Sequence, residues 1–296
     1  MSNKILVERQ GPVTTFIINR PEVRNALDRE ASTALARAIR AFEDDDEAKV
    51  AVLTGAGGTF CAGGDLKELA SGIDYIPWAG SPEGPLHRAA KKPVIAAVAG
   101  HACAGGLGVA LWCDLRIAER SASFAVLSRR WGVPMSDGTT VRLPRLIGMS
   151  RALDMLLTAR SVGGEEAERI GLANRVVADG TARQEAEALA RLIAQFPQIA
   201  MRSDRASAYA QADLTVDQAI ARELELASDA RRLEARAGAA RFAAGAGRHG
   251  EVRQVPPAEA SSGGRSEGSS GGSPEGSSDG SSEGRPGGGR PEPGGR

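Results

Sequence analysis

The apolar residues in the first half of the chain form short runs that are typical of β-strands. Ile5 and Val7 alternate with polar residues, and a β-branched and aromatic run follows at residues 13–18. A glycine and a proline separate these two segments, so we expect a hairpin. Residues 50–53 and 94–99 are wholly apolar, which predicts strands that are buried on both faces.

Other segments carry apolar residues at helical spacing. Leu35 and Phe42 share one face of a predicted helix that Asp28 would cap. The acidic residues 43–47 are expected to form its solvated end. Residues 181–242 are helical in pattern almost throughout. Because strands alternate with helices first and helices alone follow, we predict a layered α/β body with a helical C-terminal region.

Between Lys92 and Asp114 the chain carries no charge apart from a possible one on His101. The stretch is long enough to span a membrane, but four glycines and a leading proline argue against a spanning helix. We predict instead a buried strand, a turn of small residues at 100–106 and the start of a buried helix. Such a turn presents free N–H groups and the positive end of a helix dipole, which suits negative charge.

Composition divides the chain into parts. Residues 261–296 consist only of Ser, Gly, Arg, Glu, Pro and Asp, and such a segment cannot bury apolar surface. We therefore predict a folded core at residues 1–195, a helical region at 196–250 and a disordered tail at 251–296. The folded part has the length of one α/β domain with a helical appendage.

Charge and cysteine content exclude several classes of protein. The 296 residues include 37 basic and 37 acidic side chains, a balance that gives no electrostatic footprint for nucleic acid or an acidic membrane. The N-terminus has no apolar segment of the secretory type. Three cysteines without a CxxC pair argue against disulfides and zinc. We expect a cytoplasmic protein with reduced thiols, no metal and no membrane span.

The glycine-rich segments do not match nucleotide-binding motifs. The chain has no GxxxxGK[ST], and neither GAGG nor GGLG completes a GxGxxG. No GxSxG elbow lies between a predicted strand and a predicted helix, so a serine hydrolase triad has little support.

Two glycine turns carry a resemblance to a known family. Residues 60–68 (FCAGGDLKE) and 91–118 (KKPVIAAVAGHACAGGLGVALWCDLRIA) resemble the signature segments of the enoyl-CoA hydratase/isomerase, or crotonase, superfamily. The resemblance extends over residues 3–250. It implies a crotonase-like spiral of ββα units and C-terminal helices that trimerise, often into hexamers. It also implies an acyl-CoA thioester as the substrate, with no cofactor because coenzyme A enters as part of that substrate.

The resemblance assigns roles to residues of both turns. Reactions beside a thioester put negative charge on its oxygen, which two preorganised backbone N–H groups can stabilise. By the resemblance these donors belong to Gly64 and Gly105, where glycine allows close approach. The implied acyl-CoA contacts are Arg24, Ala62, Asp65, Leu66 and Lys67. By residue type, Asp65 also fits a helix cap and Arg24 a solvated side chain.

The chain departs from the family at the positions of acid and base. The well-known hydratases use two glutamates, and a gap-free alignment puts Gly108 and Ser128 there, at the family's spacing. Neither residue is a general acid or base at neutral pH. A working aspartate of some family members aligns with Ser136, next to Asp137. Asp137, the one carboxylate of this loop, is therefore either an acid/base or a turn residue bonding its own backbone.

Four other side chains are weaker candidates. His101 lies in the second turn, where its imidazole reaches the substrate or is a packing residue. Cys103 has no evident base. Arg129 and Arg130 meet an acyl-chain carboxylate or a neighbouring subunit, or are simply solvated.

Three functional hypotheses follow. The first is an acyl-CoA enzyme with Asp137 as its single acid/base, which suits double-bond isomerisation. The second keeps hydration, with Ser128 positioning water and Asp137 transferring the proton. The third is a non-catalytic acyl-CoA-binding protein that has lost the acids. A carboxylate of Asp137 that pointed away from the thioester site would weaken both enzyme hypotheses.

Overall fold

The computed structural model describes residues 3–73 and 86–247. All of them lie in one compact unit, Met1–Val255, and the second unit, Pro256–Arg296, is outside the described residues. The tail predicted at 251–296 is outside them as well. The boundary between a core at 1–195 and a helical region at 196–250 stays a prediction.

Six strands form the central sheet, in the order β1-β2-β3-β4-β6-β9. They are β1 (Ile5–Gln10), β2 (Val13–Ile18), β3 (Val50–Gly55), β4 (Val94–Val98), β6 (Leu115–Glu119) and β9 (Arg175–Val177). The predicted hairpin of β1 and β2 is confirmed, and the remaining neighbours pair in parallel. Such strands are buried on both faces, which explains the wholly apolar runs.

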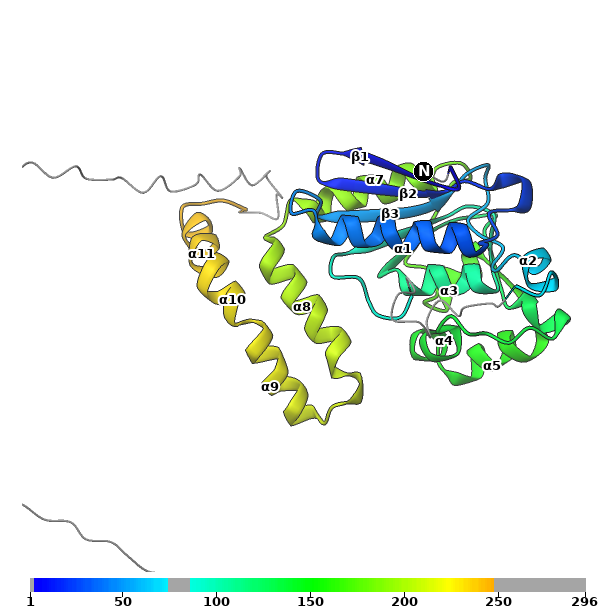
Figure 1. Ribbon diagram of the computed structural model, residues 1–296. Helices are drawn as coiled ribbons and strands as arrows, with labels where there is room; N and C mark the ends of the chain where they lie inside the picture. The colour runs from blue at the N-terminus through cyan, green and yellow to red at the C-terminus, as the bar shows by residue number, and fades with distance from the viewer. Residues whose placement is uncertain (1–2, 74–85, 248–296) are drawn as a thin grey trace, which may run out of the picture. The chain divides into compact units, whose positions relative to one another are not determined.

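Helices cover both faces of this sheet (Figure 1). Helix α7 (Ala182–Ala194) packs on the face that carries Val50 and Val52 of β3. Leu53 faces the other side, in the cluster that includes α1 (Arg29–Asp44) and α3 (Gly105–Trp112). Asp28 caps α1 as predicted, because its carboxylate accepts a hydrogen bond from the Ala31 N–H at 2.7 Å.

A second sheet runs through the glycine turns. Its order is β5-β7-β8, with β5 at His101–Cys103, β7 at Ser123–Ala125 and β8 at Ser161–Gly163. The prediction of a simple turn at 100–106 is wrong, because β5 occupies its middle and α3 begins at Gly105. Pairing with β7 satisfies the backbone of β5, and this contact leaves no local signal in the sequence.

The remaining helices are either short or come after the last strand of the central sheet in the chain. They are η1 (Pro21–Val23), α2 (Leu66–Ala70), η2 (Leu127–Trp131), α4 (Thr139–Ile147), α5 (Met149–Thr158), α6 (Gly164–Arg169), α8 (Gln198–Ala210), η3 (Gln211–Asp213), α9 (Val216–Leu226), α10 (Ser228–Ala230), the π-helical turn η4 (Arg231–Ala235) and α11 (Arg236–Ala243). The expected solvated end of α1 is corrected at Glu43, which is buried and lies 2.6 Å from Arg88.

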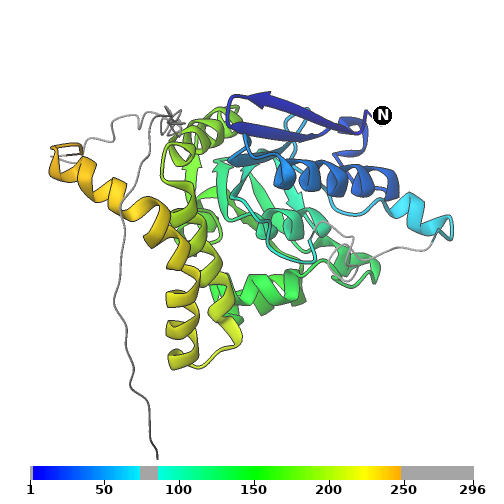
Figure 2. The same ribbon diagram turned by 60° about the vertical axis from the view of Figure 1, so that its left-hand side comes forward.

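Helices α8 and α9 pack side by side (Figures 1 and 2). Asp114 links α8 to the sheet, since its Oδ1 accepts hydrogen bonds from Arg205 Nε at 2.8 Å and from the Tyr209 hydroxyl at 2.7 Å. The predicted α/β fold with a C-terminal helical region is therefore confirmed. Within the described residues, none of the helices combines the length and the apolar character that a membrane crossing requires.

Candidate active site

One pocket gathers most of the residues singled out from the sequence. Its volume is about 470 Å³. The predicted residues that line it are Arg24, Ala62, Gly64, Asp65, Leu66, Lys67, Gly105, Ser128 and Asp137. The fold thus brings together the segment before α1, both glycine turns and the loop before α4.

Backbone hydrogen bonds hold the first glycine turn, residues 61–65. The Leu27 N–H donates to Gly63 O at 2.7 Å, and the Asp65 N–H donates to Leu27 O at 3.0 Å. The N–H of Gly64 lies between these bonds and donates to no other described residue. Because Gly64 lines the pocket, this donor is available to a ligand.

The second glycine turn leads directly into α3, whose eight residues are all buried and uncharged. The N–H of Gly105 donates no hydrogen bond within residues 3–73 and 86–247, as expected in the first turn of a helix. Gly63 brings the two turns together: its φ is +109°, and a Cβ there would lie 2.9 Å from Gly105 N. Only glycine allows this approach.

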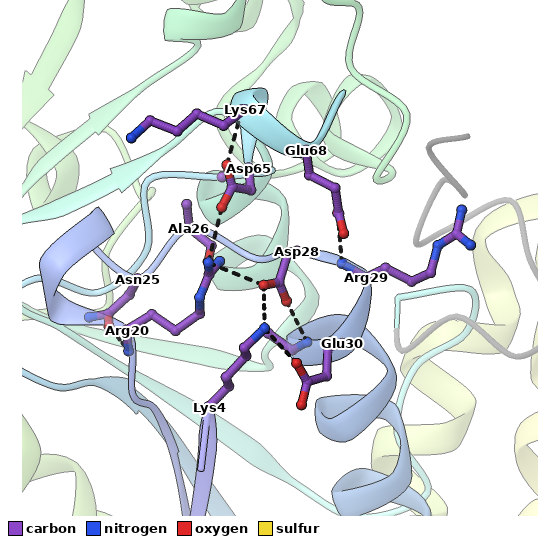
Figure 3. Close-up of polar contacts among 12 residues, drawn as sticks. Lys4, Arg20, Asn25, Ala26, Asp28, Arg29, Glu30, Asp65, Lys67 and Glu68 are labelled. Atoms are coloured by element: carbon purple, nitrogen blue, oxygen red, sulfur yellow. Dashed lines mark hydrogen bonds and ion pairs between the residues drawn. The ribbon is translucent and has the colours of Figure 1, made fainter. Parts of the chain in front are cut away.

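A network of ion pairs supports the first turn (Figure 3). Arg20 Nη2 lies 3.1 Å from Asp28 Oδ2 and 3.0 Å from Asp65 Oδ2, and Lys4 Nζ lies 2.6 Å from Asp28 Oδ2. Burial works to raise the pKa of Asp28. The hydrogen bonds from Lys4 and the Ala31 N–H, with the charge of Arg20, outweigh burial and hold the pKa below its usual range.

Asp65 has a capping role, as its residue type indicates. Its Oδ1 accepts a hydrogen bond from the Lys67 N–H at 3.0 Å and so caps α2. The side chains of Lys67 and Arg24 are exposed and line the pocket. Cations in this position suit the phosphate groups of a ligand.

Asp137 is 2% exposed and lines the same pocket as the two glycine N–H groups. Its Oδ1 accepts a hydrogen bond from the Thr139 N–H at 2.9 Å, so the turn contact anticipated for this residue is present. Burial raises the pKa of Asp137, and hydrogen bonding by Thr139 and the charge of Arg142 only partly oppose it. A carboxyl group with a raised pKa is better suited to exchange protons near neutral pH.

The two positions that align with the family's glutamates differ in their surroundings. A Cβ on Gly108 would lie 2.4 Å from Asp137 Cγ, so the Asp137 carboxyl fills the space that a side chain at 108 would need. Ser128 is buried and lines the pocket, and its hydroxyl donates to Met135 Sδ at 3.2 Å. A thioether is a weak acceptor, so this hydroxyl is easily redirected.

The weaker candidates are not among the residues that line the pocket. His101 is exposed on β5. Cys103 is buried, and burial raises the pKa of its thiol to about 11, which keeps it protonated at neutral pH. Arg129 and Arg130 are exposed on η2. Within the described residues, no group of three His, Cys, Asp or Glu side chains is placed to hold a metal ion.

The apolar wall of the pocket was not predicted from the sequence. Its residues are Leu69, Leu127, Trp131, Val133, Pro134 and Met135. Most of them belong to a segment expected to be a loop, where apolar residues follow no period. Trp131 is 71% exposed, and a cluster of large apolar residues in such a segment was the available signal. Gly63, Arg20 and Arg142 were also missed, because they act through contacts distant in sequence.

Comparison with known proteins gives consistent matches. The family model for enoyl-CoA hydratase/isomerase matches residues 8–246. A Rhizobium meliloti protein named "Probable enoyl-CoA hydratase" is 40% identical over 195 residues, which cover 65% of this chain and 76% of that protein. The short-chain-enoyl-CoA hydratase of Clostridium acetobutylicum is 34% identical over 231 residues, or 75% and 87% of the two chains.

Solved structures agree with these matches. The crystal structure of an enoyl-CoA hydratase from Mycobacterium marinum has a TM-score of 0.78 and 32% identity to this chain. The match covers 82% of this chain and 96% of that one. A second enoyl-CoA hydratase, from Mycobacterium tuberculosis, has the same TM-score at 33% identity, with the same coverage of both chains.

Proposed function

The chain belongs to the enoyl-CoA hydratase/isomerase family of acyl-CoA-processing enzymes, and we propose that it shifts the double bond of an enoyl-CoA with a single carboxyl group. In this proposal the N–H groups of Gly64 and Gly105 bind the thioester oxygen, and Asp137 moves the proton. The observation that carries the proposal is the buried Asp137 carboxyl in the pocket onto which both glycines open.

The two backbone donors would form an oxyanion hole. Both belong to turns that are already held in place, so they need no reorganisation when charge develops on the thioester oxygen. The N-terminus of α3 adds its dipole at Gly105. Removal of one such donor in an enzyme typically costs about 2.7–4 kcal/mol of transition-state stabilisation.

Isomerisation of a 3-enoyl-CoA needs only one acid/base. The Asp137 carboxylate takes the proton as the C2–H bond breaks, and the electron pair delocalises onto the thioester oxygen as a dienolate. The carboxyl group then returns this proton to C4, and the double bond moves to C2–C3. The carboxylate is regenerated, so the reaction needs no co-reactant.

Hydration is the second candidate, and the position of Ser128 favours it. Ser128 lines the same pocket as Asp137, and its hydroxyl is held only by the Met135 sulfur. Ser128 would position a water molecule while Asp137 transfers the proton. The hydratase names of the relatives support this candidate as well.

Coenzyme A would lie along the first glycine turn as part of the substrate. Ala62, Asp65 and Leu66 line the pocket there, and the exposed cations of Arg24 and Lys67 lie beside them. Their charges suit the phosphates of coenzyme A. The absence of a separate cofactor stays a prediction.

Self-association into a trimer or hexamer is also part of the proposal. Large apolar side chains of the helical region are exposed, among them Val216, Ile220, Leu224, Leu233 and Phe242. Exposed apolar surface of this kind is typical of an interface. Light scattering of the full chain tests it, and a monomer at micromolar concentration would contradict it.

The decisive experiment compares wild type with Asp137→Asn on a panel of 2- and 3-enoyl-CoA thioesters. We expect isomerisation of a 3-enoyl-CoA, reduced about 10²–10⁴-fold in the variant, since general acid–base catalysis typically contributes that much. Asp46→Asn is the matched control, because Asp46 is exposed and does not line the pocket. Formation of a 3-hydroxyacyl-CoA from a 2-enoyl-CoA would identify hydration instead.

Two outcomes contradict the enzyme proposals. Equal rates for wild type and Asp137→Asn would remove the role of Asp137. If no thioester is turned over while butyryl-CoA still binds, the chain is a non-catalytic acyl-CoA-binding protein.

A further inference from the structure

The position of the Asp137 carboxyl depends on the absence of a side chain on α3. Gly108 follows Gly105 by three residues of α3, a rise of about 4.5 Å along the axis. A Cβ on Gly108 would lie 2.4 Å from Asp137 Cγ, 2.6 Å from Oδ2 and 2.9 Å from Oδ1. Any larger residue would therefore displace the carboxyl group from this site.

Arg142 of α4 holds the main chain of Asp137 by a hydrogen bond. Arg142 Nη1 donates to Asp137 O at 3.1 Å, and Nη2 donates to Leu86 O at 2.7 Å. The guanidinium also lies against Gly138, where a Cβ would be 2.1 Å from Nη1. Arg142 thus ties the main chain of Asp137 to Leu86, while the Thr139 N–H holds the carboxyl oxygen Oδ1.

Resting on the proposed role of Asp137 as acid/base, we propose that Gly108 and Arg142 are its positioning residues. Gly108 leaves the slot on α3 that receives the carboxyl group, and Arg142 holds the main chain that presents it. A carboxyl group supplied by the loop thereby lies against Gly108 of α3, where the helix itself supplies no acid.

The variant Gly108→Ala tests whether the space at Gly108 positions the Asp137 carboxyl. The φ of Gly108 is not positive, and alanine is favoured over glycine by about 1 kcal/mol in a helix. The three atoms nearest to the added Cβ all belong to the Asp137 carboxyl, so this contact is the main opposition to the change. We expect kcat on a 3-enoyl-CoA to fall about 100-fold, the typical effect of a 1 Å misplacement, with KM and butyryl-CoA binding unchanged.

Gly238→Ala is the matched control, because Gly238 lies within α11 and the nearest atom to a Cβ there would be Arg241 Nη2, at 3.8 Å. It should retain wild-type kcat. If Gly108→Ala keeps the wild-type kcat, or loses kcat and butyryl-CoA binding together, the positioning role of Gly108 is wrong. If Asp137→Asn is inactive in either case, the proposed function stands without the positioning role.

Arg142→Gln and Arg142→Lys test the brace. The charged or titratable groups near Asp137 are Arg142 on α4 and the buried Cys61 thiol of the first turn, while Gly108 on α3 brings none. In the Gln variant we expect lower kcat and an acid limb of the kcat/KM profile at higher pH, because the cation that opposes burial is lost.

The Lys variant keeps the charge but not the paired hydrogen bonds, so kcat should fall while the acid limb stays in place. A role of Arg142 in stability alone would lower the melting temperature and leave kcat and the limb unchanged in both variants. That result would contradict the positioning role of Arg142, even if Asp137→Asn is inactive.

Discussion

The two glycine turns of the pocket are held in place by different forces. The first turn rests on charge: Arg20 lies between Asp28 and Asp65, and Lys4 adds a second cation (Figure 3). The second turn leads into α3, whose eight residues are buried and uncharged. It is held by packing and by backbone hydrogen bonds, among them those from the Cys103 N–H to Cys61 O and from the Ala104 N–H to Ala125 O.

Because of this difference, different substitutions should disturb the two halves of the proposed oxyanion hole. Arg20 lies between the largely buried carboxylates of Asp65 in the first turn and of Asp28 at the start of α1, so its loss leaves them facing each other. The second turn tolerates changes in charge elsewhere but not an added methyl group where it meets Gly63. The first turn should therefore respond to charge substitution and pH, and the contact between the turns to steric change.

The largest effect is expected for Arg20→Gln. Breaking a buried pair by removing one partner typically costs about 3–5 kcal/mol, because the remaining charges are uncompensated. Arg9→Gln is the control, since Arg9 is exposed, its partner Asp45 is only partly buried, and such a surface pair contributes about 1 kcal/mol or less. Urea unfolding of both variants measures the difference. If both variants lose the same free energy of unfolding, the ion pairs of Arg20 contribute no more to stability than a surface pair does.

Gly63→Ala should come next, and it acts on the contact between the turns. The new Cβ would meet Gly105 N at 2.9 Å, so one donor is displaced and kcat should fall by the equivalent of about 2.7–4 kcal/mol. Gly58→Ala is a control for a positive φ without a contact, because its φ is +72°, against +109° at Gly63, and no atom lies within 4 Å of the added Cβ. Steady-state kinetics measure kcat of both variants. An equal fall of kcat in the two would mean that backbone strain, and not the contact with Gly105, causes the loss.

Asp137→Asn should stabilise the protein at neutral pH. Because burial raises the pKa of Asp137 in the folded state, its favourable contribution exists below the unfolded pKa of about 3.9 and is lost as pH rises through the folded pKa. At pH 7, well above the unfolded pKa, Asp137 is therefore a net cost to stability, and we expect a gain of about 1 kcal/mol, typical of a stabilising substitution at a functional site. Thermal unfolding at pH 7 and pH 4 checks this, and a gain at pH 4 that equals the gain at pH 7 would contradict it.

The smallest effect concerns acid pH and Asp28. Its pKa is lowered in the folded state, so its stabilising contribution is present above the unfolded pKa of about 3.9 and is lost as pH falls through the folded value. The free energy of unfolding of wild type should decrease below about pH 4. Asp28→Asn, which can still cap α1, should show a weaker dependence on pH in this range. A pH dependence as strong as that of wild type would assign the acid sensitivity to other carboxylates.

Much of the fold and part of the site could be predicted from the sequence. The apolar runs of β3 and β4 predicted strands buried on both faces, and Asp28 and Asp65 cap the helices for which their residue type suited them. The strand β5 was not predicted, because its pairing with β7 has no local signal. The sequence also left open whether the loop carboxyl faces the pocket, since a gap-free alignment pointed to Ser136; both residues line it, and Asp137 is the buried one.

Patterns between residues close in sequence were thus enough for the apolar strands β3 and β4 and for the helix caps, because strand and helix periods and capping act over a few residues. The second glycine turn was predicted only in part, because the strand β5 inside it pairs with the distant strand β7. The contact of Gly63 with Gly105 N, the carboxyl of Asp137 on Gly108 and the brace of Arg142 across Asp137 and Leu86 came only from the tertiary structure. Each joins residues far apart in the chain, and whether a few ångströms of space are filled or empty there depends on how the whole core packs.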